Sequence, residues 1–401
     1  MVHYNTNLVN TISPPVMDAR RWLQETPIET NQELLNLSQA APVDPPPDDL
    51  LNHMAESIKM NPASNIYGPV LGNPELREEI AARWSILYQG EINPSHVAIT
   101  SGCNQAFAAT VATLAEPGDS VLIAAPWYFN HKMWLDMMGI NTTVLTLEKD
   151  LQPNIERARK LISKDLKAIS LISPNNPCGT EYSKETIWEF YQLAKENNLT
   201  LIVDETYRDF LSNDNELHEI FQDPDWNRHF VHLYSFSKAF RLTGHRVGAV
   251  IASDNFVPQI EKYLDTVSIC PNQLGQLGAL FGLKNLMGWL VKEKKIILQR
   301  REALKKGFKF LPEWNLLGCG AYFAYVTHPF DMRSDELVKL FLRKTNMLML
   351  PDTMFEQLKP ADEIRTYGQQ IRIAYANIDQ NQIEDFFLRI NRFTKENLGY
   401  I

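Results

Sequence analysis

A single lysine set between hydroxyl side chains gives the first indication of chemistry in this sequence. Lys238 follows Ser235 and Ser237, and Arg246 comes eight residues later with a glycine two residues to either side. An apolar run over residues 230–234 precedes this segment and is typical of a buried strand. Burial would lower the pKa of Lys238, so that its neutral amine can attack an aldehyde. The hydroxyls and the guanidinium suit a phosphate monoester. The alternative is a surface lysine in a serine-rich turn.

An aldehyde and a phosphate on one ligand indicate pyridoxal 5'-phosphate, and this cofactor also needs an acid. Its ring is an electron sink only while the ring nitrogen stays protonated. The apolar run 201–203 fits an interior parallel strand and ends at Asp204, where open α/β sheets bind ligands. Asp204 is therefore the candidate acid, and Tyr207 is a candidate donor to the phenolate oxygen. A helix N-cap after a strand would also explain Asp204.

Two further strand-to-loop junctions add candidates. The strand expected at 169–172 runs into a loop rich in proline and asparagine, where Asn176 can donate its amide to the same phenolate oxygen. An ordinary turn is the alternative. The run 97–100 leads into Gly102, Cys103 and Asn104 at the start of an expected helix. Free N–H groups at a helix start form a phosphate cradle.

These segments, taken in order, resemble the class I/II aminotransferases, the aspartate aminotransferase-like enzymes of fold type I. The similarity extends from about Leu35 to the C-terminus. The matching motifs are Asn175-Asn176-Pro177-x-Gly179-Thr180, Asp204-Glu205-x-Tyr207, Ser235-x-Ser237-Lys238 and Gly244-x-Arg246-x-Gly248. The resemblance implies a transaminase that uses pyridoxal phosphate. It would move an amino group from an L-amino acid to a 2-oxo acid by a ping-pong mechanism.

The resemblance also implies roles for single residues. Lys238 would form the imine with the cofactor and then carry the proton between the substrate and the cofactor. Asp204 would pair with the ring nitrogen, and His131 would support Asp204 from behind. The other cofactor contacts implied are Tyr207 and Asn176 on the phenolate oxygen, Tyr128 on the ring face, and Ser235, Ser237, Arg246 and the Gly102-Cys103-Asn104 backbone on the phosphate.

The resemblance also implies which residues contact the substrate and a second subunit. Arg372, in the run 371–374, would clamp the substrate α-carboxylate, a role that suits the fork of a guanidinium. Asn176 and Ala40 would also contact the substrate. Tyr67 would reach the phosphate of a neighbouring subunit, which implies a homodimer. Ala40 stands where relatives usually carry glycine, and a Cβ there would either narrow the pocket or be tolerated by the loop.

The substrate side chain is less constrained by the sequence. Aromatic or long apolar substrates are a hypothesis that rests on possible pocket residues: Trp127, Tyr128, Tyr322, Phe323 and Met354. The same side chains could serve stacking and core packing alone. Arg241 is a possible second arginine for a dicarboxylate substrate, although packing in the cofactor loop suits it better.

Two alternative functions use the same residues. A β-eliminating lyase of the C-S lyase kind would need the same lysine and the same cofactor, because fold and cofactor do not fix the reaction. A non-catalytic regulator with a pyridoxal phosphate domain is the other alternative. Such regulators often carry a DNA-binding region, for which this sequence has no room before Leu35, and the cofactor residues look complete.

Composition limits the class of protein further. The 401 residues carry 39 basic and 48 acidic side chains, so the net charge is 39 − 48 = −9, which argues against a nucleic-acid partner. Four cysteines without CxxC spacing or a histidine cluster favour reduced thiols in the cytoplasm and no metal site. We expect no signal peptide and no membrane partner, since no apolar run is long enough to span a bilayer.

The sequence predicts an α/β fold with two domains. Residues 1–47 should pack with the small domain, residues 48–285 should form a large cofactor-binding domain, and residues 286–401 a smaller α+β domain. A stiff proline-rich linker is expected at 42–47. The large domain should hold a mostly parallel seven-stranded sheet between helices. Its expected strands are 98–100, 120–124, 143–147, 169–172, 201–203, 231–234 and 247–251.

The helices are predicted from the segments between these strands. In the large domain they are 75–88, 104–115, 184–197 and 261–267, and a long helical stretch from about 274 to 310 leads to the small domain. There, 321–326 and 370–374 are expected strands, and 334–346 and 380–396 are expected helices.

Overall fold

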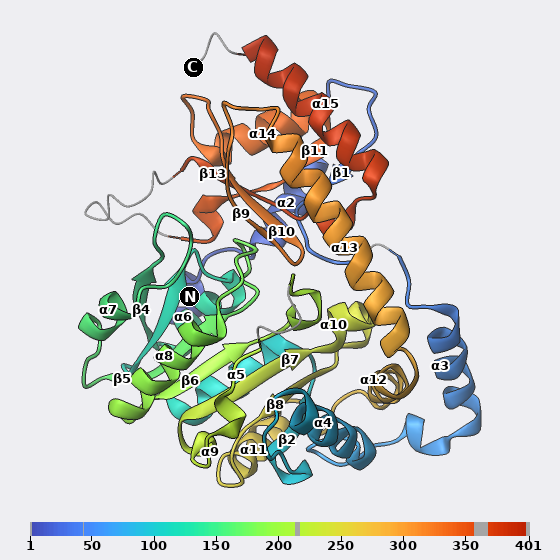
Figure 1. Cartoon of the computed structure of the whole chain (residues 1–401), viewed down its shortest axis with the longest axis vertical. Helices are drawn as coiled ribbons and strands as arrows, with labels where there is room; N and C mark the ends of the chain where they lie inside the picture. The colour runs from blue at the N-terminus through green and yellow to red at the C-terminus, as the bar shows by residue number, and fades with distance from the viewer. Residues whose placement is uncertain (1, 43, 213–216, 357–367, 398–401) are drawn as a thin grey trace.

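A computed structural model describes residues 2–42, 44–212, 217–356 and 368–397 of the chain (Figure 1). Its main feature is a seven-stranded sheet with the order β2-β8-β7-β6-β5-β3-β4. The strands are β2 (Val97–Thr100), β3 (Ser120–Ala125), β4 (Asn141–Thr146), β5 (Leu166–Ile172), β6 (Thr200–Asp204), β7 (Phe230–Ser235) and β8 (Gly248–Ile251). Only β8 runs antiparallel to its neighbours, β2 and β7. The predicted α/β class with a mostly parallel seven-stranded sheet is confirmed.

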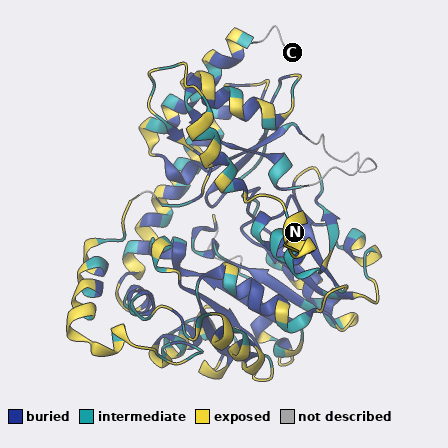
Figure 2. Ribbon diagram, turned by 180° about the vertical axis from the view of Figure 1, so that it is seen from behind, coloured by how far each residue is buried: buried dark blue, intermediate teal, exposed yellow. Residues whose placement is uncertain are grey.

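The sheet is buried on both faces, which explains the continuous apolar runs in the sequence. All residues of β2, β3, β7 and β8 are buried. Along β7, Phe230 and Tyr234 join one hydrophobic core, whereas Val231 and Leu233 join another, because successive side chains point to opposite faces. Figure 2 shows the strands as a buried layer beneath helices whose outer sides are exposed.

Different helices cover the two faces. The core that contains Val231 and Leu233 is closed by α5 (Cys103–Leu114), α6 (Phe129–Met138) and α11 (Val257–Ser268). The core that contains Phe230 and Tyr234 is closed by α4 (Pro74–Leu87) and α8 (Lys184–Glu196). Ser183 caps α8 by accepting a hydrogen bond from the Thr186 N–H group at 3.1 Å, which satisfies one of the free donors of the first turn.

The C-terminal part of the chain forms a second, antiparallel sheet with the order β12-β13-β10-β9. Its strands are β9 (Asn315–Gly320), β10 (Phe323–Thr327), β12 (Leu350–Pro351) and β13 (Gln370–Ile373), and the helices α14 (Ser334–Thr345) and α15 (Gln380–Asn397) accompany them. The expected helical stretch 274–310 is two helices, α12 (Gln273–Asn285) and α13 (Met287–Phe308). They are separated at Leu286, whose ψ of 15° is not helical. Figure 1 shows α13 running from the large sheet to the small one.

The N-terminal segment contacts the C-terminal part of the chain. Strand β1 (Leu35–Asn36) pairs in parallel with β11 (Met347–Leu348). Helix α2 (Pro15–Glu25) precedes β1, and α3 (Asp48–Met60) packs beside α12. Val43, within the expected linker, lies outside the described residues. The domain boundaries at 47 and 285 stay predictions.

The sequence patterns did not predict several shorter elements. They are β1, β9, β11, β12, α1 (Thr6–Asn10), α2, α3, α6, α7 (Ile155–Lys160), α9 (Trp226–His229) and α10 (Phe236–Ala239), with 3-10 turns at 62–65, 94–96, 208–210, 220–222, 243–245, 352–354 and 375–377. Among the described residues, no helix combines the length and the apolar character that a membrane span needs.

Candidate active site

A cavity of about 520 Å³ lies at the carboxyl ends of β5, β6 and β7. Its lining includes every residue that the sequence assigned to direct contact with the cofactor or with the substrate carboxylate, except Gly102 and Tyr67. The lining residues are Pro14, Val16, Gln39, Ala40, Ala41, Cys103, Asn104, Tyr128, Phe129, Asn130, Ile172, Asn176, Asp204, Thr206, Tyr207, Ser235, Ser237, Lys238, Thr243, Arg246 and Arg372. Parallel strands end together at one edge of the sheet, and this edge therefore gathers residues that are far apart in sequence.

Lys238 lies on α10, the single helical turn that follows β7. The Ser235 side chain caps this turn by accepting a hydrogen bond from the Ser237 N–H group at 3.2 Å. Burial, together with the charges of Arg246 and Arg372, lowers the pKa of Lys238 to about 7. The Lys238 amine donates a hydrogen bond to the Ala40 carbonyl. A large fraction of this amine is therefore neutral at neutral pH and able to act as a nucleophile.

Asp204 ends β6 and is 3% exposed. Its Oδ1 accepts hydrogen bonds from the Thr206 backbone N–H at 2.9 Å and from the Thr206 hydroxyl at 2.7 Å. Its Oδ2 lies 3.5 Å from His131 Nε2. Burial lowers the pKa of His131 to about 4, so this imidazole is neutral, and its ring stacks on Phe107 at 3.6 Å between centroids. The carboxylate is thus fixed by neutral groups.

The other end of the cavity is formed by Arg246 and the start of α5. Arg246 donates to the Ser237 hydroxyl at 3.3 Å, to the Thr243 carbonyl at 3.1 Å and to the Ser101 carbonyl at 3.3 Å. Gly102, with φ of +86°, is the N-cap of α5. The first N–H groups of a helix have no acceptor within the helix and point outward. This end therefore combines a guanidinium, hydroxyls and free N–H groups, which are the donors that a phosphate needs.

The backbone of β8 packs closely against the start of α5, which forms part of this end of the cavity. A Cβ on Gly248 would lie 2.7 Å from the Gly102 carbonyl carbon and 2.8 Å from the Cys103 nitrogen. A side chain at position 248 would therefore displace the start of α5.

Arg372 projects from β13 and is almost fully buried. It donates to Asn176 Oδ1 at 3.0 Å and to the Ser38 carbonyl, and it lies over the rings of Phe323 and Phe355. Its Nε has no hydrogen-bond partner among the described residues. Burial lowers the pKa of Arg372 to about 10, so the group remains charged at neutral pH. A buried cation whose hydrogen bonds go only to neutral oxygens is costly unless an anionic ligand pairs with it.

Aromatic side chains occupy the remaining wall. Tyr128 donates to Asn104 Oδ1 at 3.2 Å and accepts from Asn130 Nδ2 at 3.0 Å. Burial raises the pKa of Tyr128 to about 12. Burial also raises the pKa of Tyr207 well above its ordinary value. Both phenols therefore stay protonated and can donate a hydrogen bond.

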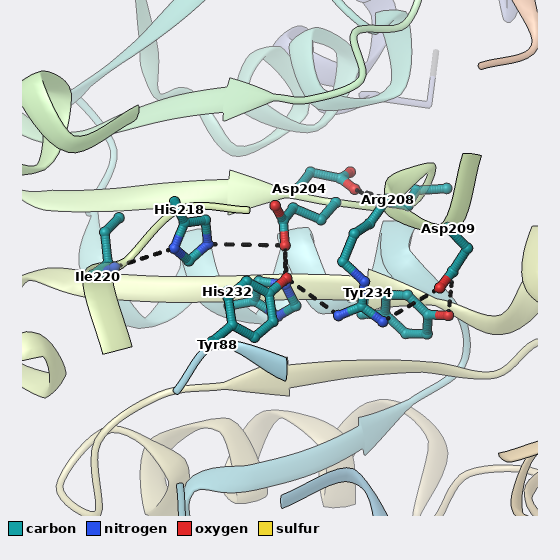
Figure 3. Close-up of polar contacts among 10 residues, drawn as sticks. Tyr88, Asp204, Arg208, Asp209, His218, Ile220, His232 and Tyr234 are labelled. Carbon is teal, nitrogen blue, oxygen red and sulfur yellow. Dashed lines mark hydrogen bonds and ion pairs between the residues drawn. The ribbon is translucent and has the colours of Figure 1, made fainter. Parts of the chain in front are cut away.

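A charged network lies beside this cavity, starting one residue after Asp204 (Figure 3). The Glu205 carboxylate accepts from Tyr88 and contacts His232 Nε2 at 2.7 Å. Burial opposes its ionisation, but the neighbouring His218, His232 and Arg208 lower the pKa of Glu205 to about 2.

Arg208 extends the network towards Asp209 and lies over the Trp84 ring, 4.1 Å from its centroid. Tyr234 donates to Asp209 at 2.6 Å. The pair Asp204-Glu205 thus places its first carboxylate at the cavity and its second in this network.

Several predicted residues lie away from the cavity. Tyr67 is 76% exposed. Arg241 does not line the cavity, and its guanidinium forms an ion pair with both carboxylate oxygens of Glu293 at 2.7 and 2.8 Å. Of the five possible substrate-pocket residues, only Tyr128 lines the cavity, whereas Tyr322 and Phe323 pack against Tyr207.

Other cavity residues were not predicted. Thr206 could have been found from its place two residues after Asp204, where it closes a local turn. Gln39, Phe129, Asn130 and Thr243 lie within three residues of predicted site residues in the sequence, whereas no local signal marks Pro14 or Val16. Ala40 is not among the residues with positive φ, so its backbone does not require the expected glycine. Among the described residues, no group of His, Cys, Asp and Glu could hold a metal ion, and the four cysteines are not in disulfides.

The fold and the site together define a class of protein. Residues 32–390 match the family Aminotransferase class I and II, and the chain belongs to this family. It is a transaminase of a pyridoxal phosphate-dependent family, whose substrates are amino acids and 2-oxo acids. The predicted family and enzyme class are confirmed.

The relatives include enzymes named for different substrates. An aromatic aminotransferase of Arabidopsis thaliana is 28% identical over 316 residues, covering 76% of this chain and 78% of the relative. An aspartate aminotransferase of Thermotoga maritima is 29% identical over 368 residues, covering 90% and 93%. The structure of Thermus thermophilus aspartate aminotransferase with maleate has a TM-score of 0.87 at 20% identity, covering 98% of this chain and 100% of that one, which shows a common fold. None of these relatives is named as a lyase.

Proposed function

We propose that this chain binds pyridoxal 5'-phosphate in the 520 Å³ cavity and transfers amino groups there by a ping-pong mechanism. The charge of the cavity carries the proposal. Among the described residues, its lining contains two guanidinium cations, Arg246 and Arg372, the amine of Lys238, and one acid, Asp204. No carboxylate pairs with either guanidinium among the described residues, so the cavity can take up the phosphate of the cofactor and the carboxylate of a substrate.

The residues fit the cofactor part by part. Arg246, Ser235, Ser237 and the first turn of α5, with Gly102, Cys103 and Asn104, would hold the phosphate. Asp204 would hold the ring nitrogen, Asn176 and Tyr207 would donate to the phenolate oxygen, and Tyr128 would cover the ring. Lys238, with its lowered pKa, would bond to the aldehyde. When bound, the cofactor supplies an electron sink for the Cα–H bond of the substrate.

The chain itself supplies orientation and proton transfer. The Lys238 amine would serve as the base for the Cα proton of the substrate, because a pKa of about 7 matches this task at neutral pH. Arg372 would hold the α-carboxylate through two parallel hydrogen bonds and so fix the direction of the Cα–H bond. Asn176, which contacts Arg372 at 3.0 Å, would link the substrate end to the cofactor end.

The uncharged part of the cavity lining supports substrates with a neutral side chain. Pro14, Val16 and Phe129 are apolar, and Gln39 and Asn130 carry neutral amides. A long apolar or aromatic side chain suits this lining better than a second carboxylate does. A panel of single amino acids tests this choice, and reaction with aspartate and glutamate only would contradict it.

An exposed apolar surface supports a homodimer. Ile58, Met60 and Ile66, which precede the exposed Tyr67 in the chain, and Val267 and Ile269 at the end of α11 are each at least 43% exposed. Large exposed apolar side chains of this kind favour an interface, from which Tyr67 would reach the phosphate of the neighbouring site. Sedimentation of a fully active monomer would contradict this proposal. A cytoplasmic location is proposed on the four cysteines without disulfides.

The absorbance spectrum of the purified protein tests the main proposal. We expect a visible band with bound cofactor that bleaches when a donor amino acid is added, as a 2-oxo acid accumulates without ammonia. In Lys238→Ala the visible band should be lost and transamination should fall by about a thousandfold or more. Lys284→Ala, which removes an exposed lysine paired with Glu75 at 3.6 Å, is the matched control. A visible band that persists in Lys238→Ala would overturn the proposal.

A further inference from the structure

A short stretch of backbone contacts two basic side chains of the cavity, Arg372 and Lys238. This stretch, residues 36–41, is called the strap here. The Ser38 carbonyl accepts a hydrogen bond from Arg372, and the Ala40 carbonyl accepts one from Lys238. The strap therefore influences both the group that would bind the substrate carboxylate and the group that would move the proton.

One side chain, Asn377, holds this strap at three points. Its Nδ2 donates to the Gln39 carbonyl and, at 3.3 Å, to the Asn36 carbonyl. Its Oδ1 accepts from the Ala41 N–H at 3.0 Å. Asn377 is 7% exposed, so water competes little for these bonds. A carboxamide is suited to this position because it donates and accepts at once.

Arg372 and the residues that hydrogen-bond to the strap, Ala374 and Asn377, lie in the same short segment of the chain. Asn377 follows Arg372 by five residues, and between them the Ala374 N–H donates to the Leu37 carbonyl at 2.9 Å. Any shift of the strap relative to β13 would therefore alter how the Ser38 carbonyl meets the guanidinium. Arg372 is held by only two hydrogen bonds among the described residues, to Ser38 and Asn176.

We propose that Asn377 is a positioning residue for the substrate carboxylate. It would act through the strap, which orients Arg372 for two-point binding. The inference rests on the proposed function, in which Arg372 binds this carboxylate. Without the Asn377 amide, the Gln39 and Asn36 carbonyls and the Ala41 N–H would lose buried partners, and the strap would move to regain them. The expected result is weaker binding of every substrate with an α-carboxylate.

Asn377→Asp is the sharpest test, because the variant has the same shape and keeps the acceptor but replaces the amide donor with an oxygen. We expect KM to rise about tenfold for both the amino acid and the 2-oxo acid, while kcat changes by less than about twofold. Asn377→Ala should behave in the same direction. In the protein without cofactor, hydrogen exchange over residues 36–41 should become faster, and calorimetry should show propanoate binding about tenfold more weakly than in the wild type.

Asn346→Asp is the matched control. Asn346 Nδ2 donates to the Gln32 carbonyl at 2.9 Å, so it ties down the same N-terminal segment before the strap begins. This change should leave KM and propanoate binding unchanged. If Asn377→Asp raises KM no more than Asn346→Asp does, or leaves propanoate binding intact, the inference is wrong. Weakened propanoate binding and faster exchange in a chain whose wild type transfers no amino group would support the inference and refute the proposed function.

Discussion

Gly102 and Arg246 lie so close together that a Cβ on Gly102 would overlap the guanidinium. Gly102 also has φ of +86°, a conformation that side-chain-bearing residues rarely adopt. The glycine therefore allows the guanidinium to lie against the start of α5, where both would face the cofactor phosphate.

Gly102→Ala should weaken cofactor binding by about tenfold or more, because Arg246 must move away from the phosphate end, and tenfold in affinity corresponds to about 1.4 kcal/mol. Titration of the protein with pyridoxal phosphate, followed by the visible band, measures this. Gly288→Ala is the control, since a Cβ at this helical position has nothing within 4 Å. Equal cofactor affinity in the two variants would contradict the assignment of the phosphate end.

The rate of cofactor attachment should depend on pH through Lys238. Burial lowers the pKa of this lysine from 10.5 to about 7. Below that pH the amine is protonated and cannot attack, and above it the amine is neutral. Stopped-flow absorbance after mixing the cofactor-free protein with pyridoxal phosphate should therefore give a rate that rises with pH and is half-maximal near pH 7. A half-maximal rate near pH 10 would show that the amine is not perturbed.

Asp204→Asn should keep the shape of the site and remove the one acid among the described residues that line it. The hydrogen bonds from Thr206 and the neutral His131 can accommodate an amide, so binding of the cofactor should change little. The cofactor nitrogen would lose its charged partner, and kcat should fall by about 10² to 10⁴, the range typical of a lost proton-holding group. Single-turnover bleaching of the visible band measures this. Asp254→Asn, at an exposed carboxylate, is the control, and a matching kcat in both variants would refute the role.

Arg372→Lys should retain the charge but lose the two-point contact with a carboxylate. A charge-assisted hydrogen bond contributes about 1.5 to 3 kcal/mol, so KM for both substrates should rise by about 10- to 100-fold. Steady-state kinetics with a donor and a 2-oxo acid checks this expectation. Arg343→Lys, at an exposed arginine that pairs with Glu29, should leave KM unchanged. A rise in KM for only one of the two substrates would show that Arg372 does not bind the carboxylate they share.

The sequence by itself determined the large sheet and most of the cavity. Buried parallel strands have short apolar runs as their sequence pattern, and the residues that bind ligands follow directly at the carboxyl ends of these strands. Asp204, Lys238 and Asn176 were predicted for this reason, and the cavity contains all three. Gly102 could also be predicted from the local sequence, because a turn of small residues before a helix leaves N–H groups free to bind a phosphate.

Only the tertiary structure decided what approaches these residues from far along the chain. The N-terminal segment contributes Pro14, Val16 and Gln39 to the cavity. Asn377 donates a hydrogen bond to the Gln39 carbonyl of the strap, 338 positions away in the sequence. Arg241, which the sequence left open between substrate and packing, is committed to Glu293. Such contacts depend on how the two sheets meet and on which hydrogen-bonding groups become buried there. The residues next to a side chain in the sequence do not determine how the sheets meet or which groups become buried.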